Sequence, residues 1–260
     1  MLLYPLVRTF SLRNKLNIIP LLIYWPTIFV LTHIRIPQSV QRAHVSDKTL
    51  HVLAFMVLVF LLWFAVSPVK KVNWKKPAVW WIIAAAVAYG LLDEWLQIYV
   101  GRQPDVMDFF ANLTGAFAGL ILLTVADFLP ASLIATSAVI FAAITVAKTN
   151  LAEVMPAVYT AFHFFAYALF TLLWDQYLRR KNLAANPFRL KWFFRVSVLP
   201  IVLLGAVKVF SWLAGRAIDG SDIAAALAGI GGVVAVLYLA VNALERVCRG
   251  GRLSGPSARN

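Results

Sequence analysis

GLLDEWLQIYVGRQPDVMDFFANLTGAFAGL, residues 90–120, places a dense group of polar side chains between two apolar segments. The glycine and proline between the segments predict a turn, so this region is expected to form two helices joined by a short loop. Polar groups are costly in a membrane, and a cluster of them at the ends of apolar helices therefore indicates a functional site. The polar residues in question are Asp93, Glu94, Gln97, Arg102, Asp105, Asp108 and Asn112.

The rest of the chain is strongly apolar. Hydrophobic residues make up 62% of the 260 residues and charged residues only 13%, a composition that excludes an ordinary soluble domain. Apolar windows long enough to cross the roughly 30 Å hydrocarbon core of a bilayer recur along the chain. We therefore predict an all-α membrane protein with about eight transmembrane helices, near residues 17–33, 49–67, 78–100, 106–126, 131–147, 156–177, 192–213 and 223–244.

The positive charge of the chain fits membrane topology better than nucleic-acid binding. The formal net charge is +13, but the basic residues are spread over short segments between apolar windows, above all 70–76 and 179–195. Basic loops stay in the cytoplasm, and the pattern therefore predicts that both termini are cytoplasmic. Cys248 is the only cysteine, so no disulfide can form within the chain.

An internal repeat divides the chain into two parts. The pattern GRxxDxxDxxAxLxG of residues 101–115 recurs at residues 215–229, and LHVLAF at 50–55 resembles FHFFAY at 162–167. We interpret residues 1–126 and 127–260 as tandem four-helix units. Because each has an even number of spans, the units are expected to be parallel, about an axis along the membrane normal.

The two copies differ in the helix before the GR loop. Asp93, Glu94, Gln97 and Asn112 of the first copy correspond to Val207, Lys208, Ser211 and Ala226 of the second. We infer that the first unit carries the activity and that the second is degenerate. A buried ammonium at Lys208 would need an acceptor, for which Asp219 and Asp222 are the local candidates.

Helical geometry gathers the polar residues of the first unit. Asp47 and His51 are four residues apart, as are Asp93 and Gln97, and such pairs share a helix face. On the next helix the stripe Asp108, Asn112, Gly115 and Gly119 follows spacings of three and four, and its glycines allow close helix approach. With the N-terminus inside, all these faces lie at the extracytoplasmic end of the unit.

This set of side chains allows several chemistries. Asp93, Glu94, Asp108 and His51 could act as general acid and base, while Arg102 could clamp an anionic group. Asp47, Lys48, Gln97, Asp105 and Asn112 complete a binding set. A divalent metal held by Asp47, His51 and the 93/94 carboxylates is an alternative, but spacing alone does not select it, and we assign no metal or other cofactor.

Structural roles are also open for some of these residues. Asp105 and Asp108 could cap a helix start, where Asp is favoured. His51 could be a core histidine bonded to a carbonyl group, and His163 is expected to have a structural role. Asp93 and Glu94 resist this interpretation, because a helix C-terminus favours cations rather than adjacent acids.

The combined motifs resemble the VanZ-like family of bacterial membrane proteins. They read DKxxHxxxF from Asp47, DExxQ from Asp93 and GRxxDxxDxxANxxGxxxG from Gly101, and the resemblance covers about residues 15–126. It implies a protein of the bacterial inner membrane, in a family whose founding member is linked to low-level teicoplanin resistance. The motif positions carried over are Asp47, Lys48, His51, Asp93, Glu94, Gln97, Arg102, Asp108 and Asn112.

Together these features predict a cell-envelope membrane protein whose outward-facing polar cluster binds or modifies a membrane lipid or lipid-linked envelope precursor. Two alternatives are a transporter of lipids or small molecules and a structural accessory protein. The sequence does not identify a reaction, does not distinguish an enzyme from a binding protein, and does not determine the oligomeric state.

Overall fold

The fold is known from a computed structural model of the chain, which describes residues 17–33, 47–67, 70–100, 105–145, 156–183, 190–215 and 218–253. All regular structure within these ranges is helical. The eight α-helices are α2 (Ile19–His33), α4 (Asp47–Val66), α5 (Pro77–Gln97), α6 (Val106–Val125), α7 (Phe128–Thr145), α9 (Pro156–Arg180), α10 (Leu190–Leu213) and α11 (Gly220–Leu253). The predicted all-α fold is confirmed.

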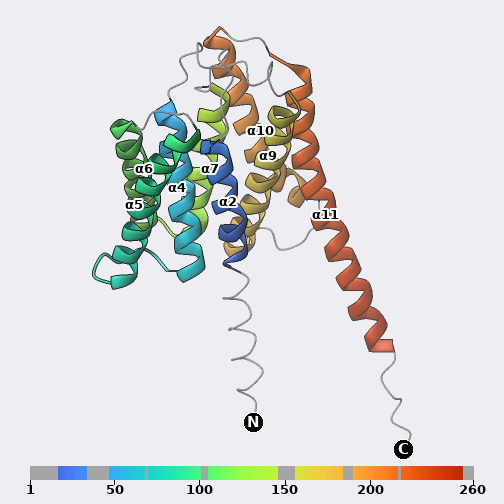
Figure 1. Cartoon of the computed structure of the whole chain (residues 1–260). Helices are drawn as coiled ribbons and strands as arrows, with labels where there is room; N and C mark the ends of the chain where they lie inside the picture. Colours follow the sequence, from blue (N-terminus) through green and yellow to red (C-terminus); the bar gives the residue numbers. More distant parts are fainter. Residues whose placement is uncertain are drawn as a thin grey trace, which may run out of the picture. The chain divides into compact units, whose positions relative to one another are not determined.

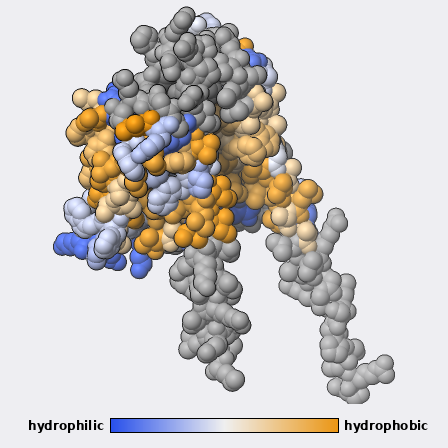
Figure 2. All heavy atoms as spheres, in the orientation of Figure 1, coloured by the Kyte–Doolittle hydropathy of each residue, from blue (hydrophilic) through white to orange (hydrophobic). Residues whose placement is uncertain are grey.

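The described helices include five that are long and apolar enough to cross a membrane: α4, α5, α6, α10 and most of α11. Shorter apolar segments lie in α2 and α7. Apolar residues spread over much of the face drawn in Figure 2, whereas hydrophilic residues gather near the turn between α4 and α5. This distribution is that of a multi-pass membrane protein, as the composition predicts.

Helix boundaries lie close to the predicted windows except at the C-terminal end. Helix α11 continues to Leu253, beyond the apolar window that ends at residue 244. Charged residues end an apolar window, but they do not interrupt helical hydrogen bonding. Pro26 and Pro200 lie inside α2 and α10, as expected for a bundle in which neighbouring helices support a kink.

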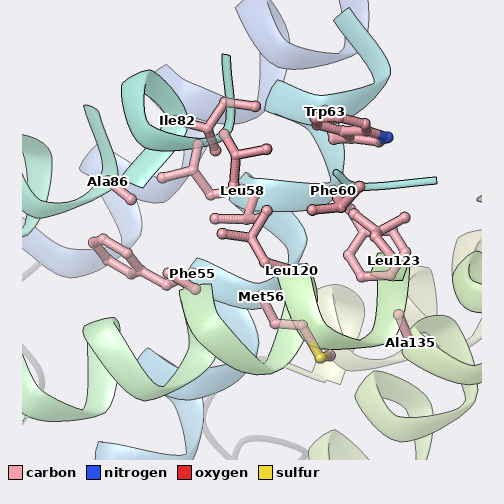
Figure 3. Packing of buried hydrophobic residues seen from close by; sticks show 14 of the residues in the cluster. Phe55, Met56, Leu58, Phe60, Trp63, Ile82, Ala86, Leu120, Leu123 and Ala135 are labelled. Carbon is pink, nitrogen blue, oxygen red and sulfur yellow. The ribbon is translucent and has the colours of Figure 1, made fainter. Parts of the chain in front are cut away.

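The chain forms two compact units, Met1–Val154 and Met155–Asn260. In unit 1, α4 packs most extensively on α6, and α2, α5 and α7 complete the group. Figure 3 shows the core of this unit, where Phe55 and Leu58 of α4, Ile82 of α5 and Leu120 of α6 converge. Helix α7 packs on α4 and α6 and so belongs to unit 1. The boundary between the compact units, after Val154, therefore lies further along the chain than the repeat boundary at residue 126.

Unit 2 repeats the main helix pair of unit 1. Helix α9 packs most extensively on α11, and α10 contacts both (Figure 1). Glycine explains the closeness of both pairs: a Cβ added at Gly115 would overlap the Val52 carbonyl, and one added at Gly229 would overlap the Phe164 carbonyl. These contacts join matching positions of the two sequence repeats and show the close helix approach that the glycine stripe predicts.

Candidate functional site

The C-terminal end of α5 carries three buried polar side chains. Asp93, Glu94 and Gln97 are only 0%, 7% and 1% exposed. A 3-10 turn at Ile98–Val100 follows the helix directly. A buried carboxylate requires hydrogen bonds or a cation, and the surroundings of each acid therefore determine what it can do.

The start of α6 supplies part of that environment. Asp105 is the N-cap residue, and its side chain accepts a hydrogen bond from the Met107 backbone N–H, which confirms the capping role considered for it. The Asp105 backbone N–H donates to Glu94 Oε2 over 3.1 Å. One Glu94 oxygen is thereby fixed by the helix start.

The other oxygen of Glu94, Oε1, is buried, and no hydrogen-bond partner for it lies among the described residues. Ligand atoms of Glu94, His51 and Asp108 all lie within 4.8 Å of one another. Three helices thus bring two carboxylates and an imidazole to one buried point, which we call the central cluster. Of the predicted residues, these three meet directly.

His51 has a defined orientation in this cluster. Its Nδ1 donates to Asn112 Oδ1 over 2.9 Å, since an amide oxygen can only accept. Nε2 lies 3.7 Å from Asp108 Oδ2. Asn112 therefore fixes the orientation of the imidazole next to the Glu94 and Asp108 carboxylates.

Lys48 contacts the central cluster through Asp108. Its Nζ donates to Asp105 Oδ2 over 2.6 Å and to Asp108 Oδ1 over 3.2 Å. The Lys48 side chain is 48% exposed, whereas that of Asp108 is 8% exposed. Hydrogen bonding from the Lys48 ammonium, supported by the Met107 backbone N–H, holds the pKa of Asp105 below its ordinary value.

Asp93 faces a different set of partners from its neighbour Glu94. Gln97 Nε2 donates to Asp93 Oδ2 over 3.3 Å, and His33 Nδ1 of α2 lies 3.7 Å from Asp93 Oδ1. Sequence reasoning missed His33, whose one signal was an ionisable residue at the end of an apolar helix. Two predicted residues lie outside this description, namely Arg102 and the side chain of Asp47.

An apolar depression adjoins the Asp93 side of the site. It has a volume of about 410 Å³ and is lined by Leu22, Trp25, Pro26, Phe29 and Tyr89. The Phe29 ring stacks on His33 with ring centroids 4.1 Å apart. Phe29 thus links the lining of the depression to His33, which lies 3.7 Å from the Asp93 carboxylate.

Unit 2 holds a smaller version of the central cluster. His163 Nδ1 donates to the Tyr159 carbonyl over 2.9 Å, and its Nε2 lies 3.9 Å from Asp222 Oδ2. Lys208 Nζ donates to the same Asp222 oxygen over 3.2 Å. The prediction that Lys208 has an aspartate partner is confirmed, and the bond of His163 to a carbonyl group of its own helix is consistent with the structural role expected for it.

Among the comparisons with known proteins, one gives a match, and this match lies in the first half of the chain. A family model described as VanZ/LLP1 matches residues 2–127. No curated protein and no solved structure matches the chain. The matched region contains every residue of the central cluster.

Proposed function

Because residues 2–127 make the chain a VanZ-like membrane protein, we propose that it acts in the bacterial cell envelope, where it binds or modifies a membrane lipid or a lipid-linked precursor at the central cluster. The observation that carries this proposal is the buried Glu94 carboxylate, which lies with His51 and Asp108 and whose Oε1 has no hydrogen-bond partner among the described residues. Burying polar groups in this way inside an apolar bundle costs free energy, and such groups therefore indicate a functional site.

The apolar depression supports a lipidic substrate. Its lining of aliphatic and aromatic side chains suits an acyl or isoprenoid chain, and one of its walls, Phe29, stacks on His33 beside Asp93. A lipid in this depression would bring its polar end towards the buried acids. Pockets with this combination of apolar walls and few polar groups are typical ligand sites.

The residues suggest a division of roles. Glu94 or Asp93, together with His51, would supply acid and base groups. Lys48, half-exposed beside Asp105 and Asp108, would bind an anionic headgroup, together with Arg102, which lies between α5 and α6 in the sequence. In the orientation that the basic loops favour, the termini are in the cytoplasm and the cluster opens to the opposite side of the inner membrane.

Envelope lipidomics in a deletion strain tests this proposal. The strain is complemented with wild type, with Glu94→Gln, or with Asp219→Asn, which alters an exposed carboxylate of unit 2 as a matched control. We expect one lipid or precursor species to accumulate in the deletion and the Glu94→Gln strain but not in the control. Teicoplanin susceptibility is measured in parallel, because the founding member of the VanZ-like family is linked to low-level teicoplanin resistance.

Membrane levels of each variant are measured in the same cultures. An unchanged lipid profile in the deletion strain, with normal wild-type expression in the complemented strain, would contradict the proposal. Equal profiles for wild type and Glu94→Gln at equal protein levels would remove the central cluster from the function and leave a structural role for it.

A further inference from the structure

The central cluster of unit 1 has more negative charge than the described residues around it can balance. The carboxylates of Glu94, Asp105 and Asp108 lie in this region, and among the described residues Lys48 is the ammonium that pairs with two of them. Lys48 contacts Asp105 and Asp108 and is itself half-exposed. Buried carboxylates of this kind are stable when a cation lies between them.

The geometry of the cluster is that of a cation site with three protein ligands. His51, Glu94 and Asp108 are all buried, and one donor atom from each lies within 4.8 Å of the others. Glu94 is more than nine-tenths buried, and its Oε1 has no hydrogen-bond partner among the described residues. A carboxylate oxygen placed in this way is available as a ligand.

Asn112 adds the support that metal-binding histidines usually have. A ligating histidine commonly donates its second ring N–H to an oxygen, which fixes the ring and directs the free nitrogen at the metal. His51 does this through Nδ1 and Asn112 Oδ1, which leaves Nε2 on the side of Asp108.

Unit 2 shows what replaces the missing carboxylate. Lys208 occupies the sequence position of Glu94, and its ammonium donates to Asp222 Oδ2, the oxygen 3.9 Å from His163 Nε2. In unit 1 the corresponding oxygen of Asp108 faces His51, while Lys48 binds the other one. A positive charge therefore lies beside the histidine–aspartate pair of unit 2, at the place where unit 1 has an acid.

We propose that unit 1 binds a divalent metal ion through His51, Glu94 and Asp108, and that the Lys208 ammonium takes the place of this ion in unit 2. One imidazole and two carboxylates suit Zn²⁺ or Mn²⁺ and leave further coordination positions for a substrate oxygen or water. The inference concerns the cluster of the proposed function but goes beyond it, because metal binding is a property of the protein without substrate.

Metal content of the purified full-length protein tests this inference. Wild type, with any affinity tag removed, is treated with a chelator, dialysed against Zn²⁺ or Mn²⁺, and analysed by elemental mass spectrometry. We expect about one ion per chain for the better of the two metals, and less than about a tenth of that for Glu94→Gln and His51→Ala. Asp219→Asn is the control and should match wild type.

The exchange of charges between the units gives a sharper test. Lys208→Glu restores the acid beside His163 and Asp222 and should raise the content to about two ions per chain. Glu94→Lys should abolish binding in unit 1, since an ammonium would fill the site. Thermal unfolding curves identify variants that fail to fold, and if Glu94→Lys fails, Glu94→Gln decides the unit 1 site.

Two results would overturn the inference. Wild type that holds no more of either metal than Glu94→Gln would remove the site in unit 1. A folded Lys208→Glu variant that gains no metal would show that Lys208 does not stand in for an ion. Intact metal binding together with an unchanged lipid profile would count against the proposed function alone.

Discussion

Each unit contains a buried pair of a histidine and an aspartate at matching positions, but the third residue beside the pair differs between the units. In unit 1 the pair His51–Asp108 meets a third buried acid, Glu94. In unit 2 the pair His163–Asp222 meets the ammonium of Lys208. The first arrangement gathers negative charge and leaves an oxygen available, whereas the second is neutralised within the unit. The difference separates a site that can take up a ligand from one that is already filled.

The shared features indicate which parts serve the fold. Both units keep the glycine against a carbonyl of the partner helix and an aspartate at the start of the last helix of the repeat. Features found in unit 1 alone are the acids of α5 and the Asn112 hydrogen bond to His51. Substitutions at matched positions can therefore separate structural from functional roles.

The largest expected effect concerns the ion pair of unit 2. Asp222→Asn leaves the Lys208 ammonium buried without its carboxylate, which should lower the free energy of unfolding by about 3–5 kcal/mol. Adding Lys208→Met should recover most of this loss, because the unpaired charge is then removed. Denaturant unfolding in detergent micelles measures both variants, and an equal loss in the single and double variants would show that the pair is not the cause.

The helix contacts come next. Gly115→Ala and Gly229→Ala each place a Cβ against a backbone carbonyl, which cannot move aside as a side chain can. We expect each to cost about 1–3 kcal/mol, the usual range for overpacking. Gly205→Ala is the control, since no atom lies within 4 Å of the added Cβ, and thermal unfolding compares the three. A neutral Gly115→Ala beside a costly Gly229→Ala would mean that the two helix pairs are not equivalent.

An effect of similar size is expected from the hydrogen bond that orients His51. Asn112→Ala removes the acceptor for His51 Nδ1 and should cost about 1–3 kcal/mol, because a buried donor is left unpaired. The same variant should weaken metal binding by about 10–100-fold, which isothermal titration with Zn²⁺ or Mn²⁺ measures. Equal metal affinity in both proteins would reduce Asn112 to a packing role.

The smallest effect concerns pH. Hydrogen bonding from Lys48 lowers the pKa of Asp105, and the Ser221 backbone N–H lowers that of Asp219. A lowered pKa in the folded state adds stability above the ordinary aspartate pKa, and this contribution is lost as the pH falls through the lowered value. Lys48→Met should raise the pKa of Asp105 and leave that of Asp219 unchanged, as carboxyl NMR titration can measure. Parallel shifts of both groups would rule out the Lys48 contact as the cause.

Periodicity and composition were sufficient to predict the helices, because apolar windows of membrane length have few other solutions. The pairing of Lys208 with an aspartate was also predictable, since a buried ammonium requires an acceptor. The glycine contacts followed from the stripe at 115 and 119, whose spacing keeps both residues on one face of α6.

The partners of the α5 acids could not be predicted from spacing. Asp93 and Glu94 are adjacent, and successive helix residues point in directions about 100° apart, so the two acids meet different neighbours. Which acid joins His51 depends on the rotation of α5 and on where α2 packs. Only the structure shows that Asp93 lies beside His33, whereas Glu94 lies in the central cluster.

The position of Lys208 opposite an aspartate also has a genetic consequence. Each lysine codon becomes a glutamate codon through a single A-to-G change at its first base. A single base transition in the codon of Lys208 would therefore give unit 2 the same three residue types as the central cluster, because His163 and Asp222 are already close together there. The reverse change at position 94 would place an ammonium beside His51 and Asp108, as in unit 2. One base therefore decides, at each of the two positions, whether the histidine–aspartate pair faces an acid or an ammonium.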